Sequence, residues 1–123
     1  MAGQNLSGLP RIRAAFFNSI AGFKATWRHE EAFRQEVYLF IAAGPLGLWL
    51  GDTGLEKALL VGSLILVIIV ELLNTGIEIV VDRIGFERHK LSGRAKDVGS
   101  AAVLSSLALA GLIWGMILLP RWI

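Results

Sequence analysis

The stretch LLVGSLILVIIVELLNTGIEIVV, residues 59–81, decides the fold of this chain. It is almost entirely apolar and long enough to cross a bilayer as a helix. Glu71 and Glu78 interrupt it, and a carboxylate at mid-depth in a membrane costs roughly 2.5 kcal/mol or more. We therefore expect a transmembrane helix whose acidic residues face protein, a polar cavity or a working site rather than lipid.

The polar residues of this segment share one face of the predicted helix. With an advance of about 100° per residue, an arc of about 80° contains all four of them: Glu71, Asn74, Glu78 and Asp82. At about 1.5 Å per residue, Glu71 lies roughly 16 Å deeper than Asp82. Such a stripe can hold a cation near Glu78 and use Glu71 as a base. Alternatively, the carboxylates pair with basic side chains or a hydroxyl of another helix.

The composition indicates a membrane protein. Of the 123 residues, 54% are hydrophobic and 18% are charged, which suits one small membrane domain, residues 1–123, rather than a soluble one. The net charge is +2, but the basic residues gather at the ends of apolar runs and form no basic face, so we expect no nucleic-acid partner. With no cysteine, the chain has no disulfide, thiol nucleophile or cysteine metal ligand.

The hydropathy pattern predicts an all-α integral membrane protein with three spans. They lie at about residues 33–50, 57–84 and 98–119. The first is short, and Pro45 between Gly44 and Gly47 predicts a kink or loosening there. Small residues crowd the beginning of the third span, which allows neighbouring helices to approach closely.

Before the spans, residues 9–29 predict an amphipathic helix on the membrane surface. Its apolar residues recur at spacings of three and four: Ile12, Phe16, Ile20, Phe23 and Trp27.

Basic residues predict the topology. The N-terminal arm through Arg34 carries five and residues 83–97 carry five, whereas residues 51–57 carry one, Lys57. By the positive-inside rule, the N-terminus and a loop over 83–97 are cytoplasmic. The C-terminus is then on the far side of the membrane, the periplasm in a bacterium.

Two further polar clusters flank the acidic stripe. Glu30, Glu31 and Glu36 lie near Arg34, and Glu30 and Arg34 have the spacing of an ordinary helical ion pair. The basic segment 83–97 suits either a lipid-headgroup anchor or a phosphate-binding loop, and His89 is its one histidine. No GxxxxGK[ST], GxGxxG or protein-kinase motif is present. The residues alone therefore predict an intramembrane acidic site beside a basic cytoplasmic surface.

Four segments together resemble the prokaryotic diacylglycerol kinase family. They are EEAFRQE at 30–36, ELLNTGIE at 71–78, VVDRIG at 80–85 and LSGRAKDVGSAAV at 91–103. The resemblance covers nearly the whole chain and includes the three-span layout. It implies a bacterial inner-membrane homotrimer, with an active site shared between subunits, that transfers the γ-phosphate of ATP to diacylglycerol and yields phosphatidic acid.

The resemblance also implies roles for individual residues. Glu71 matches the general base and Asn74 a polar residue of the same catalytic site, while Glu30 and Glu78 match carboxylates that bind Mg²⁺ carried with ATP. The implied nucleotide-binding residues are Arg11, Asn18, Glu30, Glu78, Glu87, Arg88, His89, Lys96 and Asp97. The implied lipid-binding residues are Arg11, Arg34, Gln35, Glu36, Glu71 and Ser100.

Some positions depart from the family pattern. Asn18 stands where an aromatic residue is expected, Ala14 and Ala21 replace basic residues, and Lys90 replaces an acid. None of these departures touches the implied catalytic and magnesium-binding residues.

Two other functions remain open. An undecaprenol kinase shares the core motif with a diacylglycerol kinase. A small proton or cation channel would also place carboxylates inside the membrane. The acidic stripe stops at Glu71, however, and only Gly62 and Ser63 interrupt the apolar residues before it, which favours a site at one surface over a continuous path.

Overall fold

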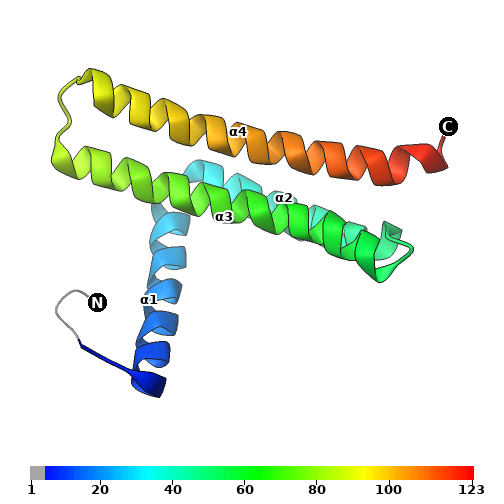
Figure 1. The fold of residues 1–123 in the computed structure, drawn as a ribbon, viewed down its shortest axis with the longest axis horizontal. Coiled ribbons are helices and arrows are strands. Elements are labelled where there is room, and N and C mark those ends of the chain that lie inside the picture. The colour runs from blue at the N-terminus through cyan, green and yellow to red at the C-terminus, as the bar shows by residue number, and fades with distance from the viewer. Residues whose placement is uncertain (1–4) are drawn as a thin grey trace.

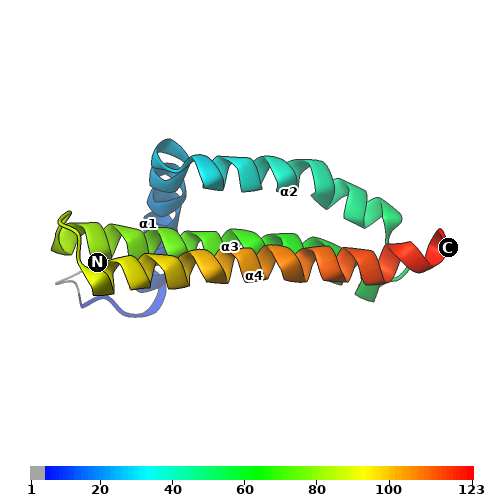
Figure 2. The same cartoon turned by 90° about the horizontal axis from the view of Figure 1, so that it is seen from above.

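The chain folds into four α-helices, as the computed structural model describes for residues 5–123. They are α1 (Gly8–His29), α2 (Glu31–Leu50), α3 (Gly54–Ile84) and α4 (Lys90–Leu118), followed by a short 3₁₀ turn, η1 (Leu119–Arg121). Helices α3 and α4 lie side by side, and α2 packs along α3 (Figures 1 and 2). Helix α1 stands across this bundle (Figure 1). The predicted all-helical fold is confirmed.

Two helices, α3 and the continuous segment Lys90–Arg121, are long and apolar enough to cross a membrane. Helix α2 does not meet the same criterion, because its first two turns carry Glu31, Arg34 and Glu36. The helix continues through Pro45, and Figure 2 shows that α2 bends over its C-terminal half. A bend is expected there, since proline has no N–H to donate to the preceding turn.

The boundaries of α4 differ from the predicted ones. The second predicted span, 57–84, ends where α3 ends, but we expected a loop over 83–97 and a third span from 98, whereas α4 already begins at Lys90. The backbone N–H of Leu91 donates to His89 Nδ1 at 3.0 Å, which caps the new N-terminus. Hydropathy marks only the apolar part of a helix, and α4 begins about two turns before that part, with mainly polar residues.

A turn at the opposite end of the bundle joins α2 to α3. The backbone N–H of Glu56 donates to Thr53 Oγ1 at 3.1 Å, which caps α3. Arg121 ties the C-terminal turn to the same place: Nη1 donates to the carbonyl of Leu50 at 2.5 Å, and Nη2 pairs with Glu56 and, at 3.1 Å, with Asp52. At the predicted periplasmic end, Arg121 thus links the C-terminal turn to the backbone of α2, the α2–α3 turn and the side chain of Glu56 in α3.

The buried core of the bundle is narrow. Leu60, Leu64 and Val67 of α3 are its centre, and a Cβ on Gly47 would come within 3.1 Å of Leu60 Cβ, so glycine lets α2 approach α3. Trp114 of α4 donates its indole N–H to the Leu60 carbonyl at 3.0 Å. Many large apolar side chains remain exposed, as expected of a surface that lipid or other subunits cover.

The indole hydrogen bond of Trp114 should contribute measurably to stability. Trp114→Phe keeps an aromatic ring and removes the donor, so we expect the free energy of unfolding to fall by about 0.6–1.7 kcal/mol. Unfolding in mixed micelles by SDS titration measures it. Trp122→Phe is the matched control, because Trp122 is exposed and makes no side-chain hydrogen bond within the described chain. Equal stability of the two variants would contradict this role.

Candidate active site

The polar stripe of α3 is buried where the sequence predicts it. Glu71 is 4% exposed, Asn74 8% and Thr75 4%, although α3 is surrounded by apolar side chains elsewhere. Glu78 and Asp82, farther along the same face, are half-buried. The stripe therefore becomes more accessible toward the α3–α4 loop, and Glu71 is its deepest member.

Helix α4 fixes the side chain of Asn74. Asn74 Nδ2 donates to Glu78 Oε1 at 3.3 Å, while Asn74 Oδ1 is buried and has no hydrogen-bond partner within residues 5–123. Gly99 of α4 lies directly opposite, and a Cβ there would collide with Asn74 Oδ1. The Asn74 carboxamide thus occupies the space that a side chain at position 99 would need.

Three carboxylates lie around that of Glu71. Glu36 on α2, Glu78 on α3 and Glu30 between α1 and α2 all lie close enough to repel it electrostatically or be repelled by it. Ion pairs in the described part of the chain form only at Asp82 with Lys96 and around Arg121. The alternative in which Glu71 or Glu78 pairs with a basic residue is therefore not realised within residues 5–123. Unpaired carboxylates in close proximity favour binding of a cation.

The oxygen ligands suit Mg²⁺, although they form no complete cage. No group of three or more histidine, aspartate or glutamate side chains in residues 5–123 is arranged to hold a metal ion by itself. Mg²⁺ is normally held by one or two carboxylates together with substrate phosphates and water. The buried oxygens Asn74 Oδ1 and Glu36 Oε2, both without a partner among the described residues, add further acceptors. The donor set therefore fits a magnesium ion that arrives with a nucleotide.

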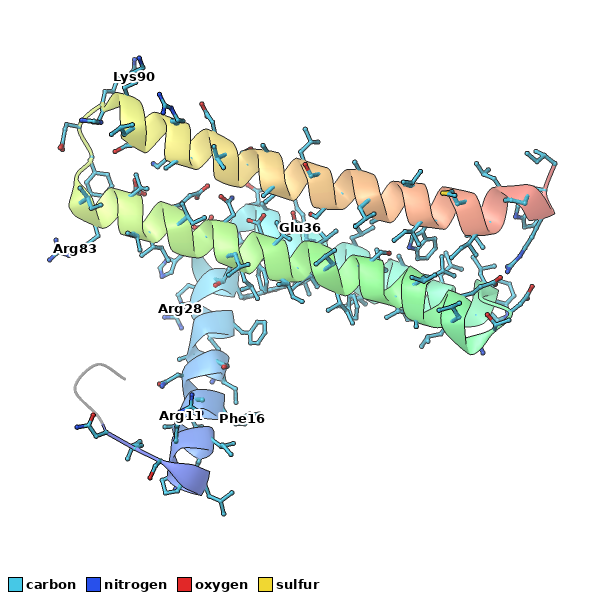
Figure 3. All side chains as sticks on the ribbon, in the orientation of Figure 1. Arg11, Phe16, Arg28, Glu36, Arg83 and Lys90 are labelled. Atoms are coloured by element: carbon cyan, nitrogen blue, oxygen red, sulfur yellow. The ribbon has the colours of Figure 1, made fainter. Side chains whose placement is uncertain are left out.

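A second group of predicted residues meets at the α3–α4 loop. A cavity of about 490 Å³ is lined there by charged residues that include Asp82, Glu87, Arg88, His89 and Lys96. Lys96 Nζ lies 2.7 Å from Asp82 Oδ1. Figure 3 shows Arg83 and Lys90 at the same end of the bundle. Cationic side chains around an open cavity suit phosphate groups.

Sequence reasoning missed one buried polar residue, Thr75. Its hydroxyl is buried without a partner in the described chain, and it lines a cavity of about 460 Å³ between α1 and α3. Glu30 and His29 line the opposite side of this cavity, whose walls are otherwise mainly apolar. Thr75 lies four residues after Glu71, so helical periodicity could have placed it on the same face.

Other predicted residues lie outside this constellation. Arg11 and Asn18 are exposed on α1, and Arg11 projects far from the bundle (Figure 3). Gln35, Asp97 and Ser100 are exposed as well. Arg34 is half-buried and donates to backbone carbonyls at the end of α1. A single chain therefore assembles Glu30, Glu36 and the stripe of α3, but leaves these remaining residues unassembled.

Comparisons with known proteins show the family of this chain. Residues 17–118 match the family described as "Prokaryotic diacylglycerol kinase". Diacylglycerol kinase of Escherichia coli strain K12 is 47% identical over 114 residues, which cover 93% of both chains. The diacylglycerol kinase of Haemophilus influenzae is 46% identical over 91% of this chain and 95% of its own length. That of Helicobacter pylori strain 26695 is 41% identical over 94% of this chain and 91% of its own.

The extent of these matches leads to one assignment. The chain belongs to the prokaryotic diacylglycerol kinase family and is a lipid kinase.

Proposed function

We propose that the chain transfers the γ-phosphate of ATP directly to the free hydroxyl of diacylglycerol, with Glu71 as general base, and releases phosphatidic acid and ADP. One observation carries this proposal: Glu71 is buried in an apolar helix without a basic partner in the described chain, and other carboxylates lie beside it. A structural carboxylate at this depth would be expected to have a cationic partner.

Glu71 is suited to accept the proton of the lipid hydroxyl. It is the deepest carboxylate of the stripe, and the hydroxyl of diacylglycerol reaches the enzyme at headgroup depth. Asn74 lies one turn closer to the loop and donates to Glu78. This bond holds one oxygen of the Glu78 carboxylate beside Asn74 and leaves the other oxygen available for the magnesium ion.

Glu30 and Glu78 would hold the magnesium ion that accompanies ATP. When bound, that ion neutralises the charge of the phosphate oxygens and helps align the γ-phosphate for in-line transfer. The carboxylates of Glu30 and Glu78 supply the hard oxygen ligands that it requires. Phosphoryl transfer depends mainly on positioning and charge neutralisation, so a Walker loop is not needed.

The nucleotide would lie against the α3–α4 loop. Lys96, Arg88 and His89 border the cavity there and would contact the phosphates, and Glu87 would contact the remainder of the nucleotide. Arg11, Asn18 and Asp97 do not line this cavity within one chain. We infer that they act across a subunit boundary in a homotrimer, in a site shared between subunits.

The lipid would enter near α2. Gln35, Glu36 and Ser100 would surround this region in the implied assembly, and Arg11 would contact the headgroup. We propose that α2 is the first of three spans in a bacterial inner membrane. The N-terminus and the α3–α4 loop would then be cytoplasmic and the C-terminus periplasmic, so that the acidic stripe opens toward cytoplasmic ATP.

The proposed base and substrate can be tested in one assay. Purified protein in mixed micelles receives Mg-ATP with either diacylglycerol or undecaprenol, and lipid phosphorylation is measured. We expect transfer to diacylglycerol in preference to undecaprenol, and Glu71→Gln should lower kcat by roughly 100- to 10,000-fold, since it cannot accept the proton. A wild-type rate for Glu71→Gln would overturn the base assignment, and preference for undecaprenol would overturn the substrate.

Magnesium binding by Glu30 has a matched control in its neighbour. Glu31 carries the same charge but is exposed, whereas Glu30 lines the cavity opposite Thr75. For Glu30→Gln, the Mg²⁺ concentration giving half-maximal activity should rise roughly fivefold or more, because losing a unit charge about 4 Å from a cation costs on the order of 1 kcal/mol even in water. Glu31→Gln should keep the wild-type value. Equal Mg²⁺ dependence of the two variants would contradict the assignment.

A substitution at Gly99 tests whether the position of the Asn74 side chain matters for the reaction. Gly99→Ala places a methyl group against Asn74 Oδ1 and displaces the carboxamide, so kcat should fall by on the order of 100-fold, as expected for a misplaced site residue. Gly62→Ala is the control, because a Cβ at Gly62 of α3 meets no atom within 4 Å. Steady-state kinetics of both variants measure the effect. Undiminished kcat in Gly99→Ala would show that the position of Asn74 is unimportant.

A further inference from the structure

The elbow between α1 and α2 consists of a single residue, Glu30. Helix α1 ends at His29 and α2 begins at Glu31, and Glu30 itself has extended backbone angles, φ −120° and ψ 110°. Its N–H donates to the Thr26 carbonyl at 2.9 Å, and its carbonyl accepts from the Arg34 N–H at 3.3 Å. The position of the Glu30 carboxylate therefore depends on the angle at which the two helices meet.

Little else holds α1 in place. It stands across the bundle (Figure 1) and approaches α2 through two aromatic pairs near the elbow. The ring centroids of Phe23 and Phe33 are 6.5 Å apart, and those of Trp27 and Tyr38 are 5.6 Å apart. Toward α3, α1 borders the cavity that contains Glu30. An elbow with so few supports would vary in angle unless a polar contact locked it.

Arg34 supplies such a contact. From the first turns of α2 its guanidinium reaches back to the end of α1, where Nη1 donates to the Trp27 carbonyl at 2.6 Å and to the Arg28 carbonyl at 3.4 Å. Carbonyls in the last turn of a helix lack intrahelical partners and carry partial negative charge. A cation from the following helix thus satisfies the end of α1 and links the two helices across Glu30.

We infer that Arg34 is a positioning residue for the kinase reaction: it locks the α1–α2 elbow and thereby holds the Glu30 carboxylate beside Glu71. This role differs from the lipid contact that the family resemblance implies for Arg34. It rests on the proposed function of Glu30 and Glu71. The conformation of the elbow, rather than the affinity for diacylglycerol, is the property that Arg34 controls.

Kinetics separate positioning from lipid binding. In Arg34→Gln, kcat should fall by on the order of tenfold or more, because small displacements of a site residue reduce rates strongly, while KM for diacylglycerol stays within about twofold of the wild-type value, since no substrate contact is lost. Arg34→Lys can still donate to one carbonyl and should recover part of the lost kcat. Lys24→Gln is the matched control, since it removes the same charge from exposed α1 and breaks no side-chain hydrogen bond within the described chain.

Hydrogen–deuterium exchange measures how well the backbone of the elbow is protected, independently of the kinase reaction. Peptides covering residues 28–34 should exchange faster in Arg34→Gln than in the wild type and at the wild-type rate in Lys24→Gln. A raised KM for diacylglycerol with unchanged kcat would overturn the inference, and so would unchanged exchange at the elbow.

The inference and the proposed function fail in different ways. Full activity of Glu30→Gln would overturn the proposed role of Glu30. An inactive Glu30→Gln beside a fully active Arg34→Gln would overturn the positioning role alone.

Discussion

The burial of the Glu71 carboxylate in an otherwise apolar helix is the constraint on which the rest of this structure depends. A charge at this depth is costly unless protein groups or a bound cation offset it. Here the neighbours are Glu30, Glu36 and Glu78, which increase the cost rather than reduce it. No ion pair in the described part of the chain offsets this cost at Glu71. Under the proposed function, the magnesium ion that accompanies ATP supplies the positive charge.

The two ends of the bundle are built differently. At one end, Arg121 joins η1 to the α2–α3 turn, and Trp114 joins α4 to α3, which gives that end direct polar links between helices. At the other end, the carboxylates gather, α1 is attached through a one-residue elbow, and open cavities border Glu30 and Lys96. At this second end, the polar links between helices are the ion pair of Lys96 with Asp82 and the contacts of Arg34 with the end of α1.

Hydrophobic periodicity predicted the helices well, because the spacing of apolar residues that identifies a helix is contained in one continuous stretch of sequence. Residues 59–81 and their acidic face behaved as expected, and Thr75 could have been added by the same periodicity. The start of α4 was missed because its first two turns are polar, and hydropathy carries no information about a helix outside the apolar region. The opposition of Gly99 to Asn74 and the reach of Arg34 to Trp27 were beyond prediction, since both depend on how separate helices approach one another.

The central claim is that the acidic face of α3 brings both substrates together for one direct transfer. The buried hydroxyl of Thr75 and the imidazole of His29 lie along the cavity near Glu30, so a covalent phosphoenzyme is the mechanistic competitor. The stereochemical course distinguishes the two most directly. With ATP made chiral at the γ-phosphorus by oxygen isotopes, a single in-line transfer inverts the configuration in the phosphatidic acid product, which is the result predicted here. Retention would indicate two successive transfers and contradict the account.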